Sequence, residues 1–299
     1  MNDQAQKLRE MAKVRDVPVF GQTSYHRPRL GNEFCKSVAV TSGKGGVGKT
    51  NISLYVSVFL AAFRKKVLLL DADLGLANVH ILLGIAPDKN IAHFIDGECG
   101  IERIICRGPG GIDIVPGASG LEKLANLDRG RLELLQHEFM KLEAQYDYLI
   151  IDTGAGIGTT VTQFASQTDI TLLVMTAEPT SLADAYAMVK VLYERGCGRI
   201  GVVVNMCLSE REGNETFDRL NTLVVKFLKR PLELFGCMLM DPDVPQYVKK
   251  QKLIVLDKGH EQFNGKVLDI TRKISGAQVD KKQSFFTRFW NKTPQVLVE

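Results

Sequence analysis

The residues with the clearest chemistry form one glycine-rich loop near the start of the chain. An apolar run at 37–42 is followed by GKGGVGKT and then by a helical pattern, which satisfies GxxxxGK[ST] in the context that this pattern requires. Glycines allow backbone N–H groups to surround phosphate oxygens, and a following helix directs its N-terminus at the anion. We therefore predict a nucleotide site made by Gly43, Lys44, Gly45, Gly46, Val47, Gly48, Lys49, Thr50 and Asn51.

Three side chains of this loop are candidates for catalysis. The Lys49 ammonium would contact the β- and γ-phosphates of the nucleotide, and the Thr50 hydroxyl would hold Mg²⁺. The general pattern does not require Lys44, which on chemistry alone is either a solvated loop charge or a further phosphate contact.

Acidic side chains follow two other apolar runs. Asp71 and Asp73 come at the end of the run at 66–71, and Asp152 ends the run at 147–152. Phosphoryl transfer depends on positioning and charge neutralisation, so carboxylates beside Mg²⁺ suit it. An aspartate after a strand can instead cap the next helix, and this alternative stays open for Asp71 and Asp73.

Alternating strands and helices must position these groups. Runs that are apolar throughout are typical of parallel strands covered by helices on both faces. They occur at 37–42, 66–71, 112–117, 147–152, 170–176, 199–205 and 233–240, with helical patterns near 48–63, 128–144, 181–195, 215–228 and 262–274. The sequence predicts an α/β domain over 36–275 with a doubly wound, mostly parallel sheet and helices on both faces.

Composition excludes several classes of protein. The 299 residues are 45% hydrophobic and 24% charged, which excludes chain-wide disorder, collagen and coiled coil. Six scattered cysteines without a CxxC pair favour reduced thiols in a cytosolic protein. The sequence contains neither a secretory signal nor a run of 18 apolar residues. The net charge of +4 comes from the two ends, because residues 36–275 are neutral.

The loop resembles the deviant Walker A motif of the MinD/ParA class of P-loop ATPases, and the resemblance covers about 36–275. In that class the extra lysine, here Lys44, crosses an ATP-sandwiched dimer interface and contacts the partner's phosphates. The resemblance also implies that Asp73, in switch I, orients the attacking water. LIIDTGAGIG (149–158) resembles switch II, where Asp152 would hold a Mg²⁺-bound water and Gly154 would move with the γ-phosphate. The implied cofactors are ATP and Mg²⁺, the metal lying near Thr50, Asp73 and Asp152.

Two further positions bear on the base. Relatives use an asparagine at the place of Asn205 to read adenine, although an Asx-turn is the alternative for this residue. The stretch 236–244 stands where relatives carry G-x-x-P-x-D-x-x-V. Gly236, Asp241 and Val244 match this pattern, whereas Leu239 replaces the proline. We predict that Asp241 lies at the nucleotide.

The N-terminal residues 3–9 read DQAQKLR, which matches the DQAxxLR activator motif of the FlhG family (also called FleN or YlxH). The resemblance implies an activator helix at 1–16 and a linker at 17–35. In that family the segment docks on the GTPase FlhF and stimulates GTP hydrolysis. The residues implied in this stimulation are Asp3, Gln4, Leu8 and Arg9. A frayed terminus is the alternative for this stretch.

The C-terminal segment 276–299 comprises a polar spacer followed by aromatic residues among basic ones. A helix here would carry Phe285, Phe286, Arg288, Phe289 and Trp290, a composition that suits an anionic headgroup layer. MinD-type proteins have a membrane-targeting helix at this position. The alternative is that the aromatic side chains dock on the core.

The resemblance implies a slow, ATP-dependent dimerisation switch that controls flagellar number and placement. Its implied partners are a second copy, FlhF, a flagellar C-ring protein or transcription regulator, and the inner face of the cell membrane, with no specific nucleic acid. The alternatives are a division-site ATPase of the MinD type and a DNA-partitioning ATPase of the ParA type. A scaffold without activity would leave Lys49 and Asp152 idle.

Overall fold

The structure is a computed structural model of the chain, and it describes residues 35–73, 78–117, 129–278 and 283–292. The predicted N-terminal helix and almost all of the predicted linker lie outside the described residues, together with Asp3, Gln4, Leu8 and Arg9.

The described residues form one sheet in which every neighbouring pair of strands is parallel except β3 and β4. The strand order is β3-β4-β2-β5-β1-β6-β7-β8. The doubly wound, mostly parallel sheet is therefore confirmed, and each of the seven predicted strands is present. The strands are β1 (Lys36–Ser42), β2 (Val67–Ala72), β3 (Cys106–Arg107), β4 (Asp113–Val115), β5 (Tyr148–Ala155), β6 (Ile170–Met175), β7 (Ile200–Cys207) and β8 (Glu233–Leu239).

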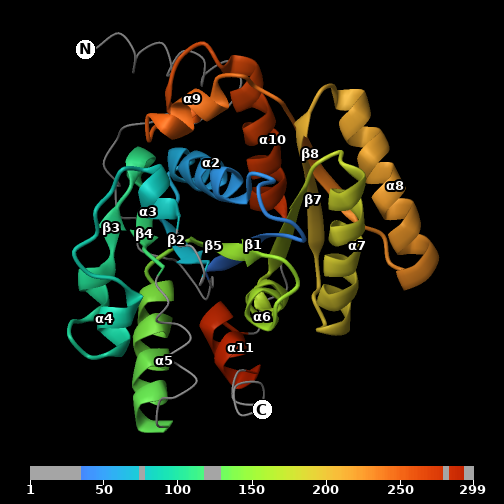
Figure 1. Cartoon of the computed structure of the whole chain (residues 1–299). Helices are drawn as coiled ribbons and strands as arrows, with labels where there is room; N and C mark the ends of the chain where they lie inside the picture. Colours follow the sequence, from blue (N-terminus) through green and yellow to red (C-terminus); the bar gives the residue numbers. More distant parts are fainter. Residues whose placement is uncertain (1–34, 74–77, 118–128, 279–282, 293–299) are drawn as a thin grey trace.

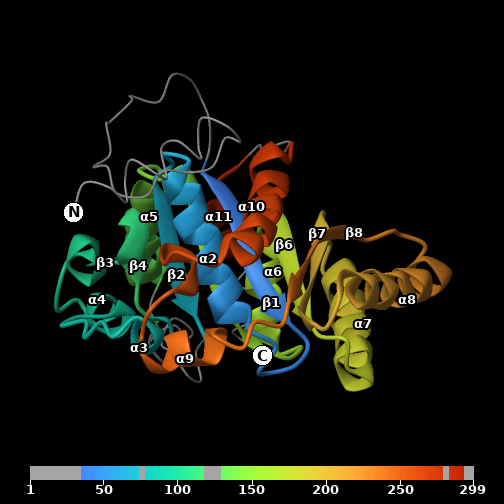
Figure 2. The same ribbon diagram turned by 90° about the horizontal axis from the view of Figure 1, so that it is seen from above.

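Helices cover both faces of this sheet (Figures 1 and 2). The helices are α2 (Lys49–Ala62), α3 (Val79–Leu82), α4 (Ile91–Ile95), α5 (Arg129–Glu143), α6 (Thr159–Gln167), α7 (Pro179–Glu194), α8 (Glu210–Leu228), α9 (Val244–Lys249), α10 (Glu261–Gly276) and α11 (Phe285–Lys292). All five predicted core helices are present. The sequence missed β3, α6 and the short α3, α4 and α9.

Alternate residues of each strand supply the two faces with apolar side chains. In β1, Val38 and Val40 pack in the core beneath α2 and α10, whereas Ala39 packs with α6 and α7. In β2, Leu68 and Leu70 contribute to the core beneath α5 and α11. Burial on both faces explains why the strands are apolar throughout.

The C-terminal helix α11 packs against the core. Phe285, Phe286, Phe289 and Trp290 are all buried, and the rings of Phe286 and Phe289 stack on Phe139 of α5 and Phe164 of α6, with centroids 4.8 and 4.5 Å apart. A helix at this position is confirmed, and its aromatic face is buried against the core in this conformation. Docking on the core, the alternative left open by the sequence, is what the structure shows.

Polar contacts hold α11 at its first turn and at its middle. The Glu143 carboxylate accepts hydrogen bonds from the backbone N–H groups of Phe285 (2.8 Å) and Phe286 (3.1 Å), which satisfies the first turn of the helix. Arg288 Nη2 lies 2.8 Å from Asp169 Oδ1, and Asp169 also accepts hydrogen bonds from the backbone N–H and the hydroxyl of Ser37. Within the described ranges, no helix is long and apolar enough to cross a bilayer.

Candidate active site

The glycine-rich loop connects β1 to α2 and bends sharply at two glycines. Gly46 and Gly48 have φ values of 79° and 87°, in the left-handed region that favours glycine. A Cβ on Gly48 would overlap the side-chain amide of Asn205, and a Cβ on Gly43 would overlap the Asp184 carbonyl of α7. The glycines at these positions are therefore required by close packing as well as by backbone conformation.

The N-terminus of α2 points out of this loop with no side-chain cap. The first backbone N–H groups of a helix need a partner, and a phosphate group supplies one. Lys49 is the first residue of α2 and is 92% buried, and its charge acts on the carboxylate of Asp152. This geometry fits the predicted phosphate site.

The two predicted carboxylates Asp71 and Asp152 lie side by side on the neighbouring strands β2 and β5. Burial, followed by the charge of Asp152, raises the pKa of Asp71 to about 7. Burial also raises the pKa of Asp152, whereas the Lys49 charge and hydrogen bonds from Thr50 and Ser53 lower it. Ser53 donates to Asp152 Oδ1 at 2.7 Å. The sequence reasoning missed Ser53, although its position one turn after Lys49 places it on the same helix face.

These oxygen donors fit Mg²⁺. The Thr50 hydroxyl, on the first turn of α2, is close enough to the buried Asp152 carboxylate of β5 to lower its pKa. Hydroxyl, carboxylate and water oxygens are the ligands that Mg²⁺ prefers. Asp73 follows β2, and a Cβ on Gly154 would lie 3.4 Å from Asp73 Oδ1. The residues predicted for the metal and for switch II are therefore neighbours.

Lys44 lies on the outer rim of the loop. Its ammonium group is 2.5 Å from Glu178 Oε2 and 3.3 Å from the Thr180 hydroxyl, both at the start of α7. The side chains of Lys44 and Glu178 are 40% and 61% exposed. In this conformation Lys44 is bound by its own chain. Sequence reasoning missed Glu178 and Thr180, because residues about 135 positions away carry no local signal of this contact.

The side chain of Asn205 supports the loop. Its amide Nδ2 donates a hydrogen bond to the Val47 carbonyl at 2.8 Å, and the residue is buried. The predicted Asn205 thus reaches the nucleotide loop, but its amide hydrogen is used to fix the loop backbone.

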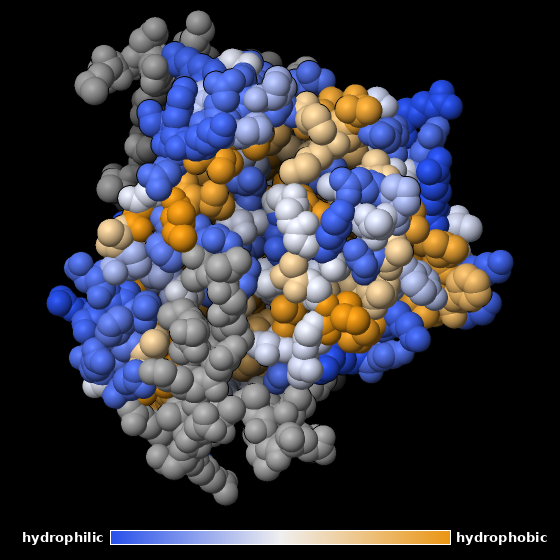
Figure 3. Space-filling view, in the orientation of Figure 1, coloured by the Kyte–Doolittle hydropathy of each residue, from blue (hydrophilic) through white to orange (hydrophobic). Residues whose placement is uncertain are grey.

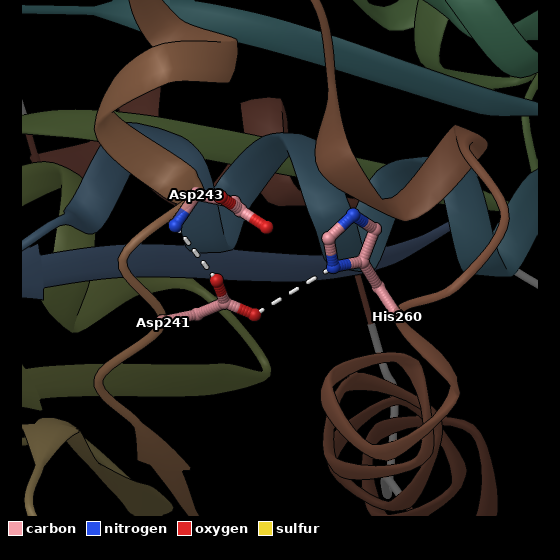
Figure 4. A group of neighbouring side chains, drawn as sticks. All are labelled: Asp241, Asp243 and His260. Atoms are coloured by element: carbon pink, nitrogen blue, oxygen red, sulfur yellow. Dashed lines mark hydrogen bonds and ion pairs between the residues drawn. The ribbon is translucent and has the colours of Figure 1, made fainter.

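The stretch that replaces the expected proline motif places Asp241 beside Asp243 and His260 (Figure 4). The backbone N–H of Asp243 donates to Asp241 Oδ1 at 2.9 Å, and His260 Nδ1 is 3.7 Å from Asp241 Oδ2. The His260 ring meets Tyr247 edge-on at 5.5 Å. A cavity of about 290 Å³ adjoins Asp241, His260 and Phe263. Asp243 and His260 were not predicted, and only the acidic pair in Asp241-Pro242-Asp243 hinted at this arrangement.

These features define a P-loop nucleotide-hydrolysing enzyme. They are a strand, a glycine-rich loop and a helix that follow one another, a buried lysine, and a carboxylate on the neighbouring strand β5. The family model described as "AAA domain" matches residues 35–194. The chain is 41% identical to "Antiactivator FleN" of Pseudomonas aeruginosa over 218 residues, which are 73% of this chain and 78% of the relative. It is 34% identical to "Flagellum site-determining protein YlxH" of Helicobacter pylori, over 85% of this chain and 84% of the relative.

The fold is also found in the MinD cell division protein of Aquifex aeolicus, at a TM-score of 0.65 and 25% identity, over 83% of this chain and all of that one. The chain belongs to the FleN/YlxH (FlhG) family of MinD/ParA-type ATPases. It is therefore an ATPase.

Proposed function

We propose that this ATPase is a dimerisation switch that controls the number and placement of flagella. The observation that carries the proposal is the position of Lys44, the loop lysine that the general pattern does not require. Its ammonium group contacts Glu178 and Thr180 at the start of α7. At this position the Lys44 ammonium can leave Glu178 of its own chain and bind the phosphates of a second copy. The flagellar role is supported by the names of the two relatives, an antiactivator and a flagellum site-determining protein.

Hydrolysis in this proposal depends on positioned charges. Bound Mg²⁺ would neutralise charge on the β- and γ-phosphates, and Thr50 and Asp152 would hold it. Lys49 and the N-terminus of α2 bind the phosphate oxygens, Asp73 orients the attacking water, and Gly154 follows the γ-phosphate. Gly45, Gly46 and Asn51 complete the loop, and Asp241 lies on the side of the base.

Exposed apolar side chains near the carboxyl ends of the strands support the dimer. Met206 and Leu208, at the end of β7, and Met240, after β8, are all exposed, as is Ile157 after β5. Figure 3 shows hydrophobic areas scattered among hydrophilic ones on one face of the molecule. Contact between two copies would cover such side chains, which otherwise remain in water.

The proposal places α11 at the cytoplasmic membrane when ATP is bound. Because its aromatic side chains are buried here, membrane binding requires that α11 leave its site between α5 and α6. The released helix would present Phe285, Phe286, Phe289 and Trp290 to lipid, with Arg288 facing the anionic headgroups.

The N-terminal motif DQAxxLR would stimulate the GTPase FlhF. Gln4 is the candidate for positioning water at the partner's site, while Leu8 and Arg9 anchor the segment and Asp3 belongs to the same activating motif. A synthetic peptide of residues 1–20 should accelerate GTP hydrolysis by FlhF, and Gln4→Ala should remove most of this effect. A peptide without effect would refute this part of the proposal. A flagellar transcription regulator is a further candidate partner, which the name of the FleN relative supports.

Size-exclusion chromatography in ATP and in ADP tests the central proposal. Asp73→Ala should bind ATP without hydrolysing it and should therefore elute as a stable dimer in ATP and as a monomer in ADP. Lys44→Ala should remain a monomer in both. If Asp73→Ala elutes identically in the two nucleotides, the chain is not a nucleotide-dependent dimerisation switch.

A further inference from the structure

Two cysteines from neighbouring strands meet at one edge of the sheet. Cys207 is the last residue of β7, and Cys237 lies in the edge strand β8. Both side chains face α8, where a Cβ on Gly213 would lie 2.5 Å from Cys237 Sγ and 3.1 Å from Cys207 Sγ. The missing side chain of Gly213 therefore leaves the room that both sulfur atoms occupy.

The two thiols have different surroundings. The Cys207 thiol donates a hydrogen bond to the Val204 carbonyl at 3.4 Å. The neighbouring Cys237 thiol, followed by burial, raises the pKa of the Cys207 thiol. The adjacent Cys207 thiol, with the positive charges of Lys266 and Lys273, lowers the pKa of the Cys237 thiol. The thiolate is the reactive form of cysteine, and Cys237 is also the more exposed residue of the two, so Cys237 is the nucleophile of the pair.

Access also differs between the two sulfurs. Cys207 is fully buried, whereas Cys237 retains 8% of its surface in solvent. Only a small oxidant can approach such a site. Cys197 offers a contrast, since it is almost completely buried and its sulfur lies 3.2 Å from the Thr171 hydroxyl.

We propose that Cys207 and Cys237 are a peroxide-sensitive dithiol that closes to a disulfide and alters the nucleotide loop. The Cys237 thiolate attacks hydrogen peroxide, the O–O bond breaks, and the hydroxide released is protonated to water. The Cys207 thiol then attacks the Cys237 sulfenic acid, forming the S–S bond, and its proton leaves with the hydroxyl group as a second water. Two thiols are oxidised, and one peroxide is reduced to two waters.

The end of β7 connects this pair to the nucleotide site. Asn205, which holds the Val47 carbonyl, lies two residues before Cys207. The pairing of β7 with β8 shifts register between Val204 and Cys207, and Met206 has a φ of 57°. A covalent bond at Cys207 would act on this irregular end, and loss of the hydrogen bond from Asn205 would weaken ATP binding roughly fivefold.

Peptide mapping of the full chain tests the pair directly. The protein is treated with graded hydrogen peroxide, its remaining thiols are blocked, and it is digested without reduction. We expect a peptide that links Cys207 to Cys237, is lighter by two hydrogens and is cleaved by dithiothreitol. Cys207→Ser and Cys237→Ser should each abolish it, whereas Cys197→Ser should leave it unchanged.

Two results would overturn the proposal. If both cysteines remain fully alkylated at peroxide concentrations that oxidise free glutathione, the pair is not a peroxide-sensitive dithiol. If the linked peptide forms but a fluorescent ATP analogue binds the oxidised and reduced chains equally, the disulfide does not act on the nucleotide loop. Formation of the linked peptide does not depend on dimerisation or on any flagellar role, so its failure is distinguishable from failure of the proposed function.

Discussion

The two ends of the central strand β1 differ in how completely their polar groups are paired. At its amino end, Ser37, Asp169 and Arg288 form a closed set of hydrogen bonds that fixes α11 against the core. At its carboxyl end, the first turn of α2 has no side-chain cap and Lys44 is held by an exposed ion pair.

This difference indicates which end changes contacts during function. Buried polar groups that are fully paired stabilise one conformation, whereas a helix N-terminus without a cap is poised for an anion. The carboxyl end of β1 is therefore suited to binding a ligand, whereas the amino end holds α11 against the core. Release of α11 must then break several buried contacts at once, which requires the free energy of nucleotide binding or dimerisation.

The largest expected effect lies at the carboxyl end. Lys49→Ala removes the buried cation that faces Asp152 and the phosphate site, so we expect ATP hydrolysis to fall by a factor on the order of 10³. Hydrolysis is measured by phosphate release, and circular dichroism checks that the fold is retained. Lys65→Ala is the matched control, because Lys65 is exposed after α2 and should leave the rate unchanged. A Lys49→Ala protein with near-normal hydrolysis would contradict the site.

The next effect lies at the amino end. Asp169→Ala removes the acceptor shared by Ser37 and Arg288, and leaves Arg288 without its buried carboxylate. We expect the free energy of unfolding to fall by about 3 kcal/mol, as measured by urea denaturation. Asp218→Ala, on the exposed side of α8, is the control and should change it little. If the two variants are equally stable, the amino end is not the fixed end.

Local patterns in the sequence were sufficient to predict the strands and the helix that form the nucleotide site. The strands β1, β2 and β5 are continuous apolar runs, and GKGGVGKT fixes the turn between β1 and α2. The start of α8 was placed five residues too late, because the cap at Ser209, which accepts from the Glu212 N–H, precedes the apolar periodicity. Two-residue β3 has too little sequence to carry a pattern.

Contacts between distant residues could not be predicted in the same way. Glu143 caps α11 from 142 residues away, and Glu178 binds Lys44 from 134 residues away. Cys207 and Cys237 lie in no recognisable motif and meet only because β7 and β8 are neighbours in the sheet. Such pairs depend on the assembled sheet and not on any segment alone.

The smallest expected effect concerns Lys44. Glu178→Gln keeps the size of the side chain but removes its charge, so Lys44 is released from its own chain and is free for the phosphates of a second copy. Exposed ion pairs contribute at most about 1 kcal/mol, so we expect ATP-dependent dimers to form up to roughly fivefold more tightly. Analytical ultracentrifugation in ATP, with Asp73→Ala present to block hydrolysis, measures this change.

The control is Glu194→Gln, an exposed glutamate at the other end of α7, which should leave the dimer unchanged. High salt should reduce the difference between Glu178→Gln and the parent chain, because the pair that restrains Lys44 is exposed and is screened. A weaker dimer in Glu178→Gln would mean that Glu178 holds Lys44 in the dimer as well as in the monomer. Lys44, at the carboxyl end of β1, would then keep its partner as the polar groups at the amino end do. The two ends would differ only in the uncapped N-terminus of α2.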